Sequence, residues 1–140
     1  MDTPRESFDR AIHLLKGHAG YRQHPYRDAR GILTIGYGRN LEAKGVSLKE
    51  AYWMLMEDIG DAEAQLASLT CWSGLSPVRQ AALIDLTVNP GFAGVLEFKR
   101  MLARIDLGDW SGAAAELRDS LAEKQEPHRV ADLCAMLIAG

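Results

Sequence analysis

Apolar residues recur every three or four positions near the start of the chain, which is the spacing of one face of an α-helix. These residues are Phe8, Ile12 and Leu15. Residues 3–6 in front of them, with the sequence TPRE, form a capping box that has proline in the first helical turn. The pattern therefore predicts a first helix over residues 4–16, followed by a loop at the glycines within residues 17–20.

The pattern changes between residues 25 and 40, where strand-forming side chains are interrupted by glycines. The strand formers are Tyr26, Ile32, Thr34, Ile35 and Tyr37, and the glycines are Gly31, Gly36 and Gly38. Glycine in such a segment marks a turn or a close approach of two backbones. The segment predicts a small β-hairpin, which is the one strong strand signal in the chain.

Helical spacing returns after the hairpin and continues to the end of the chain. A second capping box, SLKE at residues 47–50, opens a helix of about five turns that reaches Leu66 and is long enough to join two lobes. Ser76-Pro77 begins another helix, which ends at the NPG sequence of residues 89–91. Three further helices are predicted at residues 98–107, 110–118 and 129–138. The order of helix, hairpin and helices predicts an α+β fold that is mostly α.

Composition and charge narrow the class of protein. The 140 residues (15.4 kDa) are 47% hydrophobic and 25% charged, which is typical of a globular protein of one domain or two small lobes that needs no disulfide or metal to hold its core. Sixteen basic and 19 acidic residues give a formal net charge of -3. This balance argues against a nucleic-acid-binding protein that relies on a broad basic face.

Neither a membrane span nor a signal peptide is expected. No run of about 20 apolar residues is present, and the first residues, MDTPRE, lack the apolar core of a signal sequence. The two cysteines, Cys71 and Cys134, have no cysteine or histidine at zinc-ligand spacing. We therefore expect two free thiols, buried or partly buried, and no metal site or cofactor.

Ionisable residues crowd one irregular segment, residues 16–40, and this is where chemistry is expected. Its glycines do not form a dinucleotide-binding loop, because they follow a hairpin and no helix begins at Gly38. Asp28 lies in a turn beside Arg27 and Arg30. On composition alone it is a solvated turn aspartate. The functional interpretation is a carboxylate held by the turn, with the Thr34 hydroxyl able to hold a water near it.

Three runs in this segment carry a resemblance to a known family. They are GHAGYR at residues 17–22, PYRD at residues 25–28 and GILTIGYGRN at residues 31–40, with an aspartate six residues before the threonine. The chain strongly resembles the active-site segment of phage-type lysozymes (endolysins), glycoside hydrolase family 24, which includes the T-even phage lysozyme. The resemblance continues through PVRQAAL at residues 77–83, NPG at residues 89–91 and QEPHR at residues 125–129.

The resemblance implies a muramidase that hydrolyses the β-1,4 bond between N-acetylmuramic acid and N-acetylglucosamine in bacterial peptidoglycan. It implies one lysozyme-like catalytic domain over residues 1–140. Its small β lobe is expected at about residues 17–46, and its helical lobe at about residues 47–140 together with the N-terminal helix at 4–16. A long helix joins the two lobes, and the enzyme is expected to be a monomer. No cofactor or nucleic acid is implied.

The family uses a glutamate, an aspartate and a threonine, and one of the three is missing here. The last two fall on Asp28 and Thr34, but the expected general acid falls on Ala19. Glycoside hydrolysis normally needs two carboxyl groups, so the resemblance implies a nearly inactive lysozyme. His18 is a poor substitute, because neighbouring helix positions point about 100° apart. Glu42, just after the hairpin, has no counterpart as an acid in the family.

Further residues are expected to line the glycan groove because they match family positions. They are Asn40, Asn89, Gly91 and Arg129. Val88 and Ala122 stand where the family often has aromatic residues, which reduces stacking on sugars. Arg129 also fits a surface residue at the start of a helix. The negative net charge implies weaker attraction to an anionic cell wall than in basic family members.

Two functions from different classes remain open. The first is an endolysin for bacterial lysis, inactivated at Ala19 by replacement or by natural decay, which stays in the host cytoplasm until it is released to the cell wall. The second is a pseudoenzyme that binds peptidoglycan without hydrolysing it. A third interpretation uses the lysozyme fold only as a scaffold for a structural or inhibitory partner.

Overall fold

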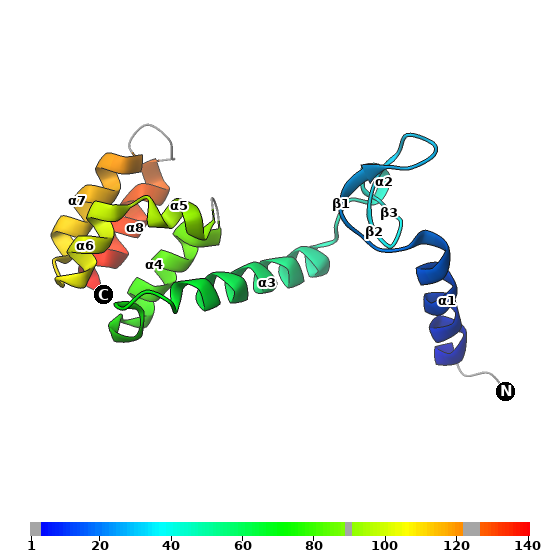
Figure 1. The fold of residues 1–140 in the computed structure, drawn as a ribbon, viewed down its shortest axis with the longest axis horizontal. Helices are drawn as coiled ribbons and strands as arrows, with labels where there is room; N and C mark the ends of the chain where they lie inside the picture. Colours follow the sequence, from blue (N-terminus) through cyan, green and yellow to red (C-terminus); the bar gives the residue numbers. More distant parts are fainter. Residues whose placement is uncertain (1–3, 89–90, 122–126) are drawn as a thin grey trace. The chain divides into compact units, whose positions relative to one another are not determined.

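A computed structural model describes residues 4–88, 91–121 and 127–140 of the chain (Figure 1). The chain divides into two compact units, Met1–Tyr52 and Trp53–Gly140. The first contains the N-terminal helix and a small sheet, and the second is helical. The predicted α+β, mostly α fold is confirmed. The predicted grouping of the N-terminal helix with the helical lobe stays a prediction.

The first unit opens with helix α1, Pro4–Ala19, which is three residues longer than predicted. The chain tolerates Gly17 inside the helix, and the helix ends where Gly20 adopts a φ of 67° and donates its N–H to the carbonyl of Lys16 at 3.0 Å. Glycine takes this left-handed conformation without steric cost, which makes it a common helix stop. Ala19 is therefore the last residue of the helix.

The predicted hairpin is present and carries a third strand. Strands β1 (Arg22–Arg27), β2 (Leu33–Gly36) and β3 (Arg39–Asn40) form an antiparallel sheet in the order β1-β2-β3. In the β1-β2 pair Arg22 lies opposite Gly36 and Tyr26 lies opposite Thr34, with an irregular register between. Residues 37–38 make the tight turn from β2 to β3.

Two capped helices follow the sheet. Asn40 caps the short helix α2, Leu41–Lys44, because its Oδ1 accepts the N–H of Ala43 at 2.9 Å. The predicted second capping box opens helix α3, Leu48–Leu66. Ser47 Oγ accepts the N–H of Glu50 at 3.1 Å, and Glu50 Oε1 accepts the N–H of Ser47 at 2.9 Å. These reciprocal bonds satisfy two donors that the first helical turn leaves unpaired.

The second unit holds the remaining elements. They are the 3-10 turn η1 (Trp72–Gly74) and the helices α4 (Pro77–Val88), α5 (Phe92–Leu96), α6 (Lys99–Asp106), α7 (Trp110–Leu121) and α8 (Pro127–Ala139). Four of these helices were predicted with boundaries within three residues, and α5 was not predicted. Helix α7 packs against both α6 and α8, and α4 packs against α5 and α8 (Figure 1). The stop predicted at residues 89–91 lies partly outside the described residues.

The hydrophobic core belongs to this second unit. Its fully buried larger side chains are Leu66, Leu83, Leu86, Val95, Met101, Leu117, Cys134 and Leu137. Arg79 connects α4 to α7 and α8. Its Nε donates to the carbonyl of Leu137 at 2.8 Å, and its guanidinium carbon lies 3.7 Å from the centre of the Trp110 ring.

The cysteines are as expected: Cys71 is partly buried, Cys134 is buried, and both are free thiols. Burial and the nearby Asp106 carboxylate raise the pKa of the Cys71 thiol. Over the described part of the chain, no helix has the length and apolar character needed to cross a membrane.

Candidate active site

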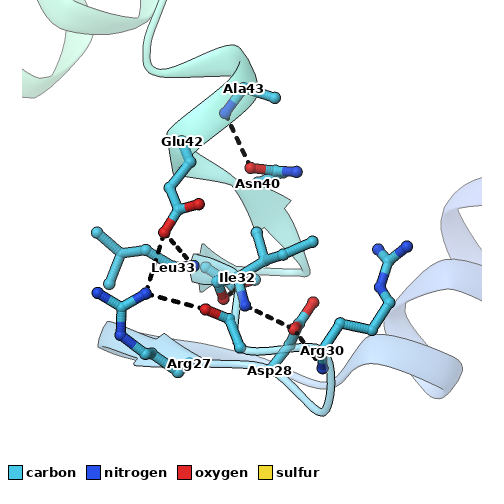
Figure 2. A network of polar contacts seen from close by, with 10 residues as sticks. Arg27, Asp28, Arg30, Ile32, Leu33, Asn40, Glu42 and Ala43 are labelled. Carbon is cyan, nitrogen blue, oxygen red and sulfur yellow. Dashed lines mark hydrogen bonds and ion pairs between the residues drawn. The ribbon is translucent and has the colours of Figure 1, made fainter.

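Asp28 is held by the turn that joins β1 to β2. Its Oδ1 accepts the N–H groups of Arg30 at 2.8 Å and of Ile32 at 2.9 Å, as Figure 2 shows. Its own N–H donates to the carbonyl of Ile32 at 3.0 Å, and its carbonyl accepts the N–H of Gly31 at 2.9 Å. An aspartate that bonds to the backbone in this way closes a turn. The carboxylate therefore has one defined position at the end of the hairpin.

These bonds also favour the ionised form of Asp28. The N–H of Ile32 lowers the pKa of the carboxyl group most, and the N–H and guanidinium of Arg30 lower it further, against the opposing effect of burial. Hydrogen bonds to the ionised form favour that form. Asp28 is therefore ionised at neutral pH, which suits a base or a stabiliser of positive charge and does not suit a proton donor.

Thr34 lies in β2 and is 3% exposed. Its hydroxyl donates to the carbonyl of Ile32 at 2.8 Å. Ile32 thus bonds to both predicted site residues, through its N–H to Asp28 and through its carbonyl to Thr34. Because the hydroxyl proton is used in this way, the Thr34 oxygen is left to act as an acceptor toward a water or a ligand.

Ala19 ends α1 beside the turn between β2 and β3. A Cβ atom placed on Gly38 would lie 3.3 Å from the Ala19 Cβ, so position 19 faces this turn closely. Gly38 itself has a φ of 78°. The helix end that the resemblance equates with the general acid therefore presents a methyl group to the hairpin.

Glu42 of α2 stabilises the hairpin through hydrogen bonds to both of its strands. The sequence did not suggest this role. Glu42 Oε1 accepts a bond from Arg27 Nη1 at 3.0 Å and one from the N–H of Leu33 at 3.2 Å (Figure 2). Arg27 Nη1 also donates to the carbonyl of Gly31 at 2.9 Å. The carboxylate of Glu42 thereby links the end of β1, the turn that carries Asp28 and the start of β2.

The other predicted site residues divide between the two units. Asn40 lies in the first unit and uses its Oδ1 as the α2 cap, which leaves its amide N–H groups as donors. Gly91 lies in the second unit, where it precedes α5 with a φ of 109°. Asn89 and Ala122 lie outside the described residues.

Val88 and Arg129 line one pocket of the second unit, with a volume of about 620 Å³. Its other lining residues are Leu55, Ile59, Ala81, Ile84 and Asp85. Arg129 is bound to Asp85, with Nη2 and Nε of the guanidinium at 2.7 and 2.9 Å from Oδ1. The sequence did not suggest Asp85, because 44 residues separate it from Arg129. The pocket combines apolar side chains with the ion pair of Asp85 and Arg129, as many ligand sites combine an apolar wall with a few polar groups.

A mostly helical chain with a three-stranded sheet that carries a turn-held aspartate and a buried threonine agrees with the lysozyme-like α+β fold that the resemblance implies. The family model for phage lysozyme matches residues 16–129. The chain belongs to the phage lysozyme family.

Curated relatives agree with this assignment. Probable T4-type lysozymes 1 and 2 of Dictyostelium discoideum are 27% and 26% identical to it, over 146 and 147 residues, and each match covers 83% of this chain and 86% of the relative. The pre-baseplate central spike protein Gp5 of Enterobacteria phage T4 is 28% identical over 133 residues. That match covers 89% of this chain but 23% of the spike protein, so the chain spans about a quarter of that relative.

Proposed function

We propose that this chain carries the peptidoglycan-cleaving site of a muramidase without its proton donor. It would bind the N-acetylmuramic acid and N-acetylglucosamine strands of bacterial peptidoglycan and cleave them very slowly. The observation that carries this proposal is the pairing of an ionised, turn-held Asp28 with a methyl group at Ala19, the end of the helix beside the hairpin. Family membership and the T4-type lysozyme relatives support the substrate class.

The chemistry explains why the missing group matters. In an inverting hydrolysis a water attacks the anomeric carbon and gives its proton to a carboxylate, while a second carboxylic acid protonates the departing glycosidic oxygen. Asp28 would take the proton of the water, and the Thr34 oxygen would help to hold that water. At position 19 there is no acid, so no protein group there protonates the leaving oxygen and its proton has to come from the solvent. Loss of a general acid typically lowers the rate by ~10²–10⁴.

The test is to restore the acid with Ala19→Glu. We expect muramidase activity on purified peptidoglycan to rise by about 10²–10⁴, because the acid contribution returns. The restored carboxyl group is expected about 6.5–9.5 Å from that of Asp28, which leaves room for a water and yields the α anomer as first product. Proton NMR of the reaction identifies this anomer.

Two variants control this experiment. Ala11→Glu adds the same charge to an exposed position of α1 and should leave activity unchanged. Asp28→Asn in the Ala19→Glu background should abolish most of the gain. Formation of the β anomer would contradict the assignment of the acid position. No gain from Ala19→Glu, in a chain that keeps its circular dichroism spectrum, would contradict the proposal that the site lost only its acid.

The same variant separates the endolysin from the binding-only pseudoenzyme. The methyl group at Ala19 also supports the binding-only function, because a chain without a proton donor can retain its substrate-binding groups. A site that lost only its acid recovers with one substitution, whereas a site adapted to binding alone stays inactive while oligosaccharides still bind. Release from the host cytoplasm to the cell wall belongs to the endolysin proposal only.

A further inference from the structure

Two tyrosine rings lie together on the surface of the first unit, next to the end of α1. Tyr21 is 64% exposed and Tyr37 is 50% exposed. Their ring centres are 5.6 Å apart, with the planes tilted by 48°. Aromatic rings are large apolar groups, and a pair that remains this open to solvent leaves ring surface free for a ligand.

The backbone explains why the rings meet. Arg22 is opposite Gly36 in the β1-β2 pair, so the residues just beyond them, Tyr21 and Tyr37, continue the same antiparallel register. Gly20 ends α1 immediately before Tyr21, and Gly38 completes the turn immediately after Tyr37. The two tyrosines therefore lie close in sequence to Ala19 and Gly38, the residues that approach each other at the end of α1.

A cation completes this surface. The Nζ of Lys16, one turn before the end of α1, lies 5.5 Å from the centre of the Tyr37 ring. An ammonium group at that distance over a ring is attracted by the negative face of the π system. The surface thus combines exposed aromatic faces with a positive charge beside them, and we name Lys16, Tyr21 and Tyr37 the tyrosine platform.

This combination matches one component of peptidoglycan. The axial C–H bonds of a pyranose ring carry partial positive charge and stack on the negative face of an aromatic ring. N-acetylmuramic acid adds a lactyl carboxylate, which N-acetylglucosamine lacks, and a neighbouring ammonium group attracts a carboxylate. A neutral sugar would use the rings alone, whereas a muramyl residue would use the rings and Lys16.

We propose that the tyrosine platform binds an N-acetylmuramyl residue of the glycan strand, with the pyranose ring against the tyrosines and the lactyl carboxylate toward Lys16. The proposal rests on the proposed function, because it takes peptidoglycan as the ligand of the same unit. It adds a binding surface that discriminates between the two sugars of the strand. The competing interpretation is that the tyrosines only fasten the helix end to the hairpin.

The experiment compares two oligosaccharides by calorimetry on the full chain. One is a peptide-free tetrasaccharide of alternating N-acetylglucosamine and N-acetylmuramic acid, and the other is chitotetraose, which has no carboxylate. Tyr21→Leu and Tyr37→Leu should each weaken binding of both ligands by about three- to tenfold, which is the worth of one aromatic contact. Tyr52→Leu, at a tyrosine that is 59% exposed on α3, is the matched control and should bind as the original chain does.

A substitution at Lys16 tests whether the tyrosine platform discriminates between N-acetylmuramic acid and N-acetylglucosamine. Lys16→Met keeps an apolar stem without the charge, and we expect it to weaken the muramyl tetrasaccharide by about three- to fivefold and chitotetraose not at all. The difference should shrink at high salt, because salt screens exposed charges. Lys49→Met, at an exposed lysine of α3, is the matched control. Equal weakening of both ligands by Lys16→Met would overturn the assignment of the carboxylate.

A measurement on the unaltered chain keeps the test independent of folding. When the muramyl tetrasaccharide saturates the protein, the ring proton resonances of Tyr21 and Tyr37 should shift while those of Tyr52 do not. Saturable binding with unshifted rings, or with undiminished affinity in folded Tyr21→Leu and Tyr37→Leu chains, overturns the platform and leaves the proposed function intact. Absence of binding to either oligosaccharide overturns both.

Discussion

The two units of this chain are stabilised in different ways. In the second unit, Leu83, Leu117 and Leu137 are among 17 buried apolar side chains, and every buried apolar residue in the described part of the chain belongs to this unit. In the first unit, within residues 5–52, the one buried side chain is Thr34. That unit keeps its shape through turn hydrogen bonds, helix caps and ion pairs.

The contrast shows where the candidate chemistry lies. Ala19, Asp28 and Thr34 all belong to the unit that lacks an apolar core. A hairpin shaped by polar bonds can present a carboxylate and a hydroxyl to a polar ligand, but each such bond contributes only about 0.5–1.5 kcal/mol. We therefore expect substitutions in the second unit to change stability most, and substitutions in the first unit to change the site.

The largest effect on stability is expected from Leu117→Ala in α7. Leu117 is completely buried, and removal of its side chain leaves a cavity as well as lost apolar contact. We expect a loss of about 2–5 kcal/mol in the free energy of unfolding, measured by urea denaturation. Leu107→Ala is the matched control, because Leu107 is 78% exposed and its truncation should change stability little. Equal losses for both variants would contradict the assignment of the core to the second unit.

The second-largest loss of stability is expected from Gly38→Ala, in the turn beside Ala19. Gly38→Ala forces a side chain onto a backbone with a φ of 78° and within 3.3 Å of the Ala19 Cβ. We expect a loss of about 1–3 kcal/mol, the usual cost of such strain, together with shifted amide resonances in β2 and β3. Gly60→Ala in α3 is the control, because nothing lies within 4 Å of the added atom and alanine favours a helix. An unchanged hairpin spectrum in Gly38→Ala would refute the close approach.

The elements that were predicted correctly are those with a strong local signal. A capping box with helical spacing predicted α3, and proline at the first helical position predicted α4. Helices α2 and α5 have four and five residues and are too short to show a period. Helix α1 extends past its predicted end because Gly17 adopts helical geometry, and the positive φ that stops the helix occurs at Gly20.

The residues of the candidate site were likewise predicted where they share a local motif and were missed where their partners are distant in the chain. Asp28 and Thr34 lie in one continuous motif, so the sequence reveals them together. The partners that hold the site are distant in the chain: Glu42 is 15 residues from Arg27, and Asp85 is 44 residues from Arg129. Spacing along the chain carries no signal for such pairs, and only the fold brings them together.

Acid should affect the first unit through two carboxyl groups. The pKa of Glu50 is lowered from 4.5 to about 2, mainly by its hydrogen bond with Arg39 and then by the N–H of Ser47, and the pKa of Asp28 is lowered from 3.8. A lowered pKa means that the ionised group stabilises the folded unit above its ordinary pKa and that this stabilisation is lost as the pH falls through the lowered value.

We therefore expect the amide resonances of Ser47 and Ile32 to titrate with midpoints below 4.5 and 3.8, the ordinary pKa values of their carboxyl partners. NMR spectra recorded from pH 6 down to about pH 1 test this, because the Glu50 transition is centred near pH 2 and has to be followed below that pH. Glu50→Gln cannot ionise, so it should remove the transition at Ser47 and leave the one at Ile32. Midpoints at the ordinary values would show that these hydrogen bonds do not hold the carboxylates in solution.

The smallest effect on stability is expected from Glu42→Gln, and it tests most directly whether polar bonds shape the hairpin. Glutamine keeps an acceptor for Leu33 but loses the charge that pairs with Arg27, and the carboxylate of Glu42 is half exposed. The cost in unfolding free energy should be about 0.2–1 kcal/mol, as for other exposed ion pairs. Glu57→Gln, at an exposed position of α3, is the matched control and should cost less.

The informative measurement on Glu42→Gln is local. Because Arg27 also bonds to Gly31, loosening of this arginine should move the amide resonances of the turn that carries Asp28, and Leu33 should exchange its amide hydrogen faster. In the Ala19→Glu background the same substitution should lower kcat more than it raises KM, since a displaced Asp28 affects the reaction more than binding. Turn resonances that match those of Glu57→Gln would mean that the backbone bonds of Asp28 hold the turn without Glu42.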